Sequence, residues 1–150
     1  MPRRPAPSSR GAMATMKASR PRNTEPELLL RSALHRRGLR FRVHRRPERD
    51  VRTVPDIVFG PARTVVFVDG CFWHRCPEHG NLPKANREWW AAKLEANVER
   101  DRRFTEVLRA RGWTVIRVWE HESVELAVDR IERSVRNVRA ATTKRSWSTK

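Results

Sequence analysis

The chain has 150 residues, of which 33 are lysine or arginine and 17 are aspartate or glutamate, so its formal net charge is +16. This length predicts one domain with a hydrophobic core, and no apolar stretch approaches the roughly 18 residues of a membrane span. The charge favours a polyanionic partner, most simply nucleic acid, over a merely soluble basic surface.

The first 24 residues contain no acid and are rich in arginine, serine, proline and alanine. This composition is typical of a transit peptide and equally of a basic DNA-binding arm, and we favour the arm. Arg3-Arg4 is not followed by the apolar segment of a secretory signal. We therefore expect residues 1–22 to be disordered without a partner.

Hydrophobic periodicity predicts the elements that follow. They are a helix from Thr24 to Gly38, strands over 39–44, 55–59 and 64–68, a helix from Asn86 to Gly112, a strand over 113–119 and a helix after Ser123. Thr24 and Glu27 form a predicted capping box, and Asn86 and Ser123 are predicted N-caps.

This order predicts an α/β layer fold with a mixed central sheet. The first two strands are expected to pair as a hairpin-like unit, and the crossover helix brings the last strand in parallel. The expected organisation is a disordered arm over residues 1–22, a domain over 23–140 and a basic polar tail over 141–150.

A cluster of thiols and imidazoles follows the third strand. Cys71, Cys76 and His79 lie within nine positions, and thiolate and imidazole ligands favour tetrahedral zinc. His121, just after the last strand, is the best candidate for the fourth ligand, and His74 competes for either imidazole place. Two buried cysteines with unrelated histidines are the alternative. With only these two cysteines and no secretory segment, a disulfide framework is not expected.

A second cluster is acidic. Asp56 begins one strand and Asp69 ends the next, so adjacent strands can bring both carboxylates to one Mg²⁺ ion. Glu27 and Asp101 can complete the pocket, and His74 can act as general base. The alternatives are that Glu27 is only a helix cap, that Asp101 pairs with an arginine and that Asp56 is a strand-edge acid.

Four segments resemble the very-short-patch-repair (Vsr) family of mismatch endonucleases. They are Pro55-Asp56, Phe67 to His74, Asn97 to Arg103, and Gly112-Trp113 through Val118-Trp119-Glu120. The resemblance runs from about Met16 to His121. It implies a restriction-endonuclease-like core with a structural zinc corner. It also implies a hydrolase that uses magnesium to nick one strand 5′ to the thymine of a T:G mismatch, a product of 5-methylcytosine deamination, in DNA repair.

The resemblance also assigns roles by position. Asp56 matches the principal magnesium ligand, His74 the general base, and Asp101 and Glu27 the supporting acids. Phe72 and Trp73 match the aromatic residues that the family inserts as a wedge beside the mismatch. Met16 matches an apolar residue of the N-terminal arm that enters from the other groove. Opening a wobble mismatch should take less energy than opening a matched pair.

This chain departs from the family pattern at two places. Some relatives carry Thr-His where it has Val68-Asp69, so the carbonyl of Val68 and the carboxylate of Asp69 are the metal-binding groups to expect there. Relatives can carry cysteine at the position of His121, a conservative difference for zinc.

The expected partner is double-stranded DNA with a T:G mismatch, and the resemblance implies pairing with a cytosine-5 DNA methyltransferase and with general mismatch-repair proteins. We expect a monomer without membrane contact, in the bacterial cytoplasm and bound to the nucleoid. Two alternatives stay open: a restriction-type or general repair nicking endonuclease of the same fold, and a catalytically silent zinc-stabilised DNA-binding module.

Overall fold

The computed structural model describes residues 24–70 and 84–147. Its elements in chain order are α2 (Glu25–Arg36), β1 (Arg42–Val43), β2 (Ile57–Phe59), β3 (Thr64–Asp69), α3 (Arg87–Ala110), β4 (Thr114–Trp119) and α4 (Val124–Trp147). None of the helices in this part of the chain is both long and apolar enough to cross a membrane.

The four strands form one mixed sheet in the order β1-β2-β3-β4. The β1/β2 and β2/β3 pairs are antiparallel, and β3/β4 is parallel. A parallel pair needs a crossover connection, and α3 forms part of the chain that connects β3 to β4. The predicted mixed sheet and parallel last strand are therefore confirmed.

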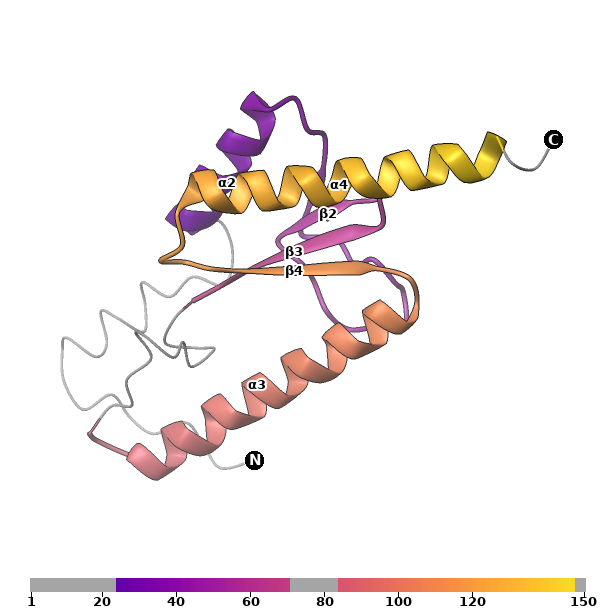
Figure 1. The fold of residues 1–150 in the computed structure, drawn as a ribbon. Coiled ribbons are helices and arrows are strands. Elements are labelled where there is room, and N and C mark those ends of the chain that lie inside the picture. Colours follow the sequence, from indigo (N-terminus) through magenta and orange to yellow (C-terminus); the bar gives the residue numbers. More distant parts are fainter. Residues whose placement is uncertain (1–23, 71–83, 148–150) are drawn as a thin grey trace.

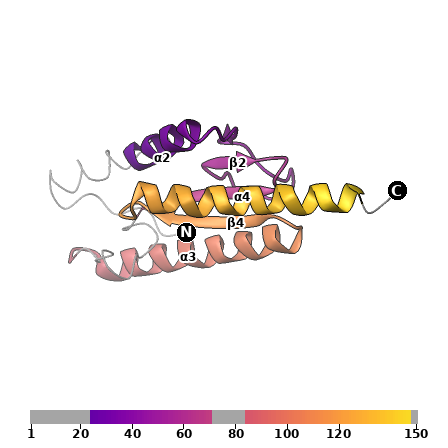
Figure 2. The same ribbon diagram turned by 45° about the horizontal axis from the view of Figure 1, so that its top comes forward.

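The helices cover the two faces of the sheet, with α2 and α4 on one face and α3 on the other (Figures 1 and 2). Side chains from α2 and α4 pack with Ile57, Val66 and Ile116 in one core. Leu108 of α3 packs with Val65 and Val115 in the second core, on the opposite face. Neighbouring residues of one strand thus serve different cores, as the alternation of side chains along a strand requires.

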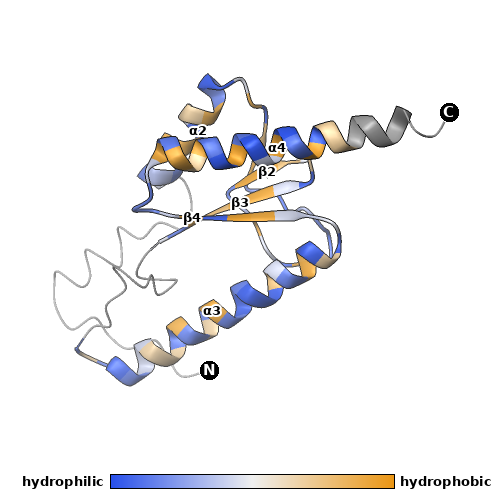
Figure 3. Ribbon diagram, viewed as in Figure 1, coloured by the Kyte–Doolittle hydropathy of each residue, from blue (hydrophilic) through white to orange (hydrophobic). Residues whose placement is uncertain are grey.

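Apolar colour in Figure 3 concentrates in the strands, whereas α3 and α4 carry apolar and polar bands in alternation. The strand β3 is buried along nearly its whole length, which confirms its prediction as a fully buried strand. At the ends of α2 and α3, Gly38 and Gly112 have φ values of 76° and 88°. Both glycines end their helices in the left-handed conformation, as predicted.

Three local predictions were wrong. The capping box is absent, because the side chain of Thr24 makes no cap hydrogen bond and Glu27 pairs instead with Arg31, 3.0 Å away. Asn86 does not cap α3 through its side chain and has a φ of 55°. The strand expected over 39–44 is reduced to Arg42–Val43, since Leu39 N donates to the carbonyl of Leu34 and His44 has a φ of 51°.

The last helix continues to Trp147, so most of the segment expected as a polar tail is helical. Its N-terminus is as predicted, with the amide of Leu126 donating to Oγ of Ser123 at 3.5 Å.

Candidate functional site

Asp56 is fixed at one end of the sheet by two hydrogen bonds to β3. Its amide donates to the carbonyl of Val66 at 3.0 Å, which extends the β2/β3 pairing by one residue. Its carboxylate Oδ2 accepts the amide hydrogen of Val68 at 2.7 Å. The carboxylate therefore lies against the last residues of β3, where the sequence placed the second acid, Asp69.

Glu27, in the first turn of α2, meets Asp56 at this end of the sheet. Glu27 is only 3% exposed, and the two carboxyl groups are hydrogen-bonded to each other. Burial, followed by the charges of Glu27 and Asp69, raises the pKa of Asp56 from 3.8 to about 7, although the amide of Val68 opposes the rise. Asp56 therefore keeps its proton to a higher pH than an ordinary aspartate does, which relieves part of the carboxylate repulsion.

Asp69 ends β3 and is held by Arg117 of β4. Nη1 of Arg117 donates to Oδ1 and Oδ2 of Asp69 at 2.9 and 3.1 Å. The side chain of Asp69 is 6% exposed and that of Arg117 is 26% exposed, so this ion pair is largely desolvated. The sequence analysis placed Asp56 and Asp69 together, and the structure does so, but it also gives Asp69 a guanidinium partner.

Asp101 lies on α3 and reaches the same arginine through its backbone. Nη2 of Arg117 is 3.4 Å from the Asp101 carbonyl. One turn earlier, Asn97 is 8% exposed, and its side-chain oxygen accepts from Arg100 at 3.1 Å. The predicted position of Asp101 beside the apolar stripe of α3 agrees with its partial burial.

These residues fit a magnesium ion better than a cation held by protein alone. Within residues 24–70 and 84–147, no three His, Cys, Asp or Glu side chains form a group that could hold a metal ion. Mg²⁺ is usually bound by one or two carboxylates together with water and substrate phosphate. The carboxyl groups of Asp56 and Glu27, which contact each other, are such a donor set. Magnesium binding by this chain remains a prediction.

His121 is the one predicted zinc ligand in the described part of the chain. It is exposed, and its ring stacks on Trp119 with the centroids 6.5 Å apart. The amide of Glu120 donates to the carbonyl of Asp69 at 3.0 Å, so the chain leaving β4 is bonded to the end of β3. The ends of β3 and β4 therefore lie side by side, and zinc binding by His121 stays a prediction.

The other predicted zinc and DNA-contacting residues lie outside the described residues. They are Cys71, Cys76, His79 and the competing His74 at the zinc cluster, and Phe72, Trp73 and Met16 at the wedge. The zinc corner, the general base and the wedge therefore stay predictions.

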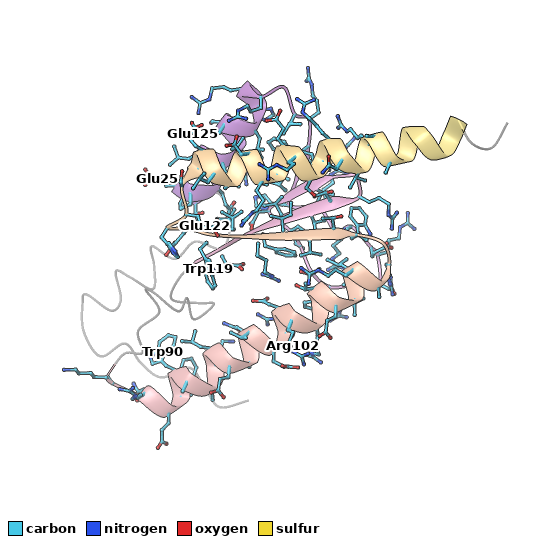
Figure 4. The ribbon with its side chains drawn as sticks, in the orientation of Figure 1. Glu25, Trp90, Arg102, Trp119, Glu122 and Glu125 are labelled. Atoms are coloured by element: carbon cyan, nitrogen blue, oxygen red, sulfur yellow. The ribbon has the colours of Figure 1, made fainter. Side chains whose placement is uncertain are left out.

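A small pocket of about 120 Å³ lies beside the acid cluster, lined by Leu29, Leu30, Val118 and Trp119 among others. Glutamates at its rim include Glu25 and Glu122, and Figure 4 shows these two with Glu125 where α2 and α4 begin. An apolar pocket with an acidic rim does not suit a DNA phosphate.

Arg117 and Arg31 are the site residues that the sequence analysis missed. Arg31 donates to Glu27 at 3.0 Å, so Glu27 has a guanidinium counter-charge, as Asp69 has in Arg117. A signal for Arg117 was present, because it is the only charged residue in Thr114–Trp119. Its pairing with Asp69 could not be predicted, because it depends on the β3/β4 register. In that register Arg117 lies opposite Phe67, two residues before Asp69.

Comparison with known proteins gives consistent matches. A family model described as DNA mismatch endonuclease Vsr matches residues 6–78. The chain is 48% identical over 126 residues to the type II nicking enzyme V.NaeI of Lentzea aerocolonigenes, covering 83% of this chain and 76% of that protein. It is 45% identical over 125 residues to the type II nicking enzyme V.XorIIP of Xanthomonas oryzae pv. oryzae, covering 82% and 88%.

The DNA mismatch endonuclease Vsr of Escherichia coli is 41% identical over 108 residues, covering 70% of this chain and 66% of that protein. The residues that the family model matches include Glu27, Asp56 and Asp69. The chain therefore belongs to the Vsr family of DNA mismatch endonucleases, and it is a DNA endonuclease.

Proposed function

We propose that this endonuclease uses magnesium to nick one DNA strand 5′ to the thymine of a T:G mismatch. The names of its relatives support the two parts of this proposal, since some are described as nicking enzymes and one as a mismatch endonuclease. The substrate would be DNA in which 5-methylcytosine has deaminated to thymine opposite guanine.

The observation that carries the proposal is the buried contact between Asp56 and Glu27. Two carboxylates in contact destabilise a folded protein unless a proton or a cation lies between them. Burial raises the pKa of Asp56 to about 7. A divalent cation would replace the proton of Asp56, so the arrangement suits a metal-dependent enzyme and has no evident structural use.

In this mechanism Asp56 would hold Mg²⁺, and the neighbouring acids Glu27, Asp69 and Asp101 would complete the site. When bound, the ion would polarise the scissile phosphate and stabilise the charge on the leaving oxygen. His74 takes a proton from the attacking water as general base. The Asp56 carboxylate keeps its orientation for this task through the amide of Val68.

Recognition of the mismatch is assigned to residues outside the acid cluster. Phe72 and Trp73 would insert beside the mismatch, and Met16 would enter from the opposite groove with the basic arm 1–22. The partial unstacking of a base step that such wedges require takes a few kcal/mol. The sequence context would be the site of a partner cytosine-5 methyltransferase, with general mismatch-repair proteins acting on the nick.

Zinc bound by Cys71, Cys76, His79 and His121 would stabilise the fold around this site. Elemental analysis of the purified chain should then give close to one zinc per molecule. His121→Ala should lower that content, whereas His35→Ala, at an exposed histidine of α2, should not. Equal zinc content in both variants would exclude His121 as a ligand.

The substrate is tested with labelled duplexes that each carry one T:G mismatch in a different methylase-type context, beside a matched T:A control. We expect a Mg²⁺-dependent nick 5′ to the mismatched thymine in at least one context and none in its matched control. Equal nicking of matched and mismatched duplexes would contradict the mismatch specificity and leave a nicking endonuclease with another target.

A further inference from the structure

Arg117 of β4 makes hydrogen bonds to three residues near the candidate site. Nη1 contacts both carboxylate oxygens of Asp69, and Nε donates to Oγ1 of Thr105 at 3.3 Å. Nη2 contacts Oγ1 of Thr105 at 3.2 Å and the carbonyl of Asp101 at 3.4 Å. These contacts hold the guanidinium group of Arg117 between the end of β3 and α3.

The position of Arg117 is fixed by packing as well as by hydrogen bonds. Its guanidinium carbon lies 4.4 Å from the centre of the Phe67 ring, directly across the β3/β4 register. Thr105 is 9% exposed, so the contacts to α3 are buried too. Arg117 thus ties the end of β3 to the helix that carries Asp101.

This arrangement divides the acids of the site into two kinds. Asp69 has Arg117 as its counter-charge, and Glu27 has Arg31 at 3.0 Å. Asp56 makes no ion pair with any of the described residues, and its carboxylate contacts the amide of Val68 and the carboxyl of Glu27. Arg31 contacts Oε2 of Glu27, whereas Arg117 contacts both carboxylate oxygens of Asp69. A cation at this end of the sheet therefore meets Asp56 without displacing an arginine, and it has to displace more contacts to reach Asp69 than to reach Glu27.

We propose that Arg117 is a positioning residue that keeps Asp69 out of direct metal coordination, so that the catalytic cation is bound through Asp56 and Glu27. This inference rests on the proposed metal-dependent nicking. It gives Asp69 a supporting role in place of the ligand role expected from the sequence. A site with fewer carboxylate ligands leaves coordination positions for water and phosphate, as Mg²⁺ requires.

The proposal is tested by binding of Mn²⁺, followed by electron paramagnetic resonance without DNA. The decisive variant is Asp69→Asn with Arg117→Met, because it removes both charges of the pair and keeps the net charge. We expect this double variant to bind Mn²⁺ within about threefold of the wild type, since neither group contacts the ion. A loss of about tenfold or more would show that Asp69 is a ligand and overturn the proposal.

The single variant Arg117→Met provides the complementary result. It frees the Asp69 carboxylate beside Asp56, so Mn²⁺ affinity should rise about tenfold, and Ca²⁺, which takes more oxygen ligands, should compete better. A folded Arg117→Met protein with unchanged affinity would contradict the proposal. If this variant does not fold, the double variant decides alone.

Arg37→Met is the matched control for the loss of an arginine that joins two elements. Arg37 pairs with Glu125, Asp129 and Glu132 of α4. It lies ten residues after Glu27, about 15 Å along the helix. The Arg37→Met variant should bind Mn²⁺ with the same affinity as the wild type.

The same measurements separate this inference from the proposed function. A wild-type protein that neither binds Mn²⁺ nor nicks DNA would overturn both. A wild-type protein that binds Mn²⁺ and nicks DNA, with a double variant that loses Mn²⁺, would overturn the inference alone.

Discussion

Asp56 destabilises the folded protein in the absence of a cation. Its carboxylate is buried beside Glu27 and near Asp69, and its pKa is raised from 3.8 to about 7. The hydrogen bond from Val68 orients it but does not offset the burial. Functional sites commonly keep such unfavourable charges, because the same repulsion that weakens the fold favours binding of a cation.

The pH dependence of stability should report this cost. Between pH 4 and pH 7 the folded protein keeps a proton on Asp56 that the unfolded chain has released. This contribution to the free energy of unfolding is present at low pH and is lost as the pH rises through about 7. Asp56→Asn removes it, so between pH 4 and pH 8 the variant should gain roughly 2–4 kcal/mol relative to wild type.

Urea denaturation at several pH values, without divalent ions, measures this difference. Asp50→Asn is the control, because Asp50 is an exposed aspartate paired with Arg111. Parallel pH profiles for wild type and Asp56→Asn would show that Asp56 is not the buried acid described here.

At the scale of elements, periodicity predicted the structure where long apolar patterns dominate. The strand Thr64–Asp69 and the helices α3 and α4 follow directly from the spacing of their apolar residues. Prediction failed where a contact between individual side chains decided the local structure. Glu27 looks like a capping residue in sequence, but the fold brings it to Asp56 and Arg31.

The candidate site shows the same division. Asp56 and Asp69 were predicted to meet because they flank neighbouring strands, and that needed only the order of the strands. The Asp69–Arg117 pair depends on the register between β3 and β4 and on the approach of α3, which no local pattern specifies. Long-range ion pairs such as Asp69–Arg117 could therefore not be predicted from the sequence.

The attachment of α3 gives a prediction at this scale. Leu108 is fully buried in the core between α3 and the sheet, whereas its neighbour Val107 is 39% exposed. Leu108→Ala should lower the free energy of unfolding by about 2–5 kcal/mol, because it leaves a cavity. Val107→Ala should lower the free energy of unfolding by less than about 1 kcal/mol. Similar melting temperatures for the two variants would contradict this packing of α3.

The whole molecule has two different ends. At one end, Asp56, the last residue of β3 and the first turn of α2 come together. At the other end, polar contacts tie the loop after β1 to the turn after α3, including Trp113 Nε1 donating to Glu48 at 2.9 Å and the Arg111–Asp50 pair. The proposed catalytic acids thus lie at one end of the sheet, and these stabilising polar contacts lie at the other.

The net charge of +16 predicts how the molecule binds DNA. The logarithm of the binding constant for duplex DNA should fall by about 0.9 per logarithmic unit of salt for each phosphate that is neutralised. Deleting residues 1–22, which carry basic residues and no acid, should make this slope shallower. Fluorescence anisotropy at several salt concentrations measures it, and a flat profile would exclude phosphate contacts as the main source of affinity.

The central claim is that the Asp56-centred acid cluster carries magnesium-dependent nicking. It is tested most directly by single-turnover nicking of one T:G duplex by wild type and Asp56→Asn, with DNA binding measured in parallel. We expect the variant to bind this duplex like wild type but to nick it slower by about three orders of magnitude, the loss typical of an essential catalytic group. Nicking by Asp56→Asn at the wild-type rate would place the catalytic site elsewhere in the chain.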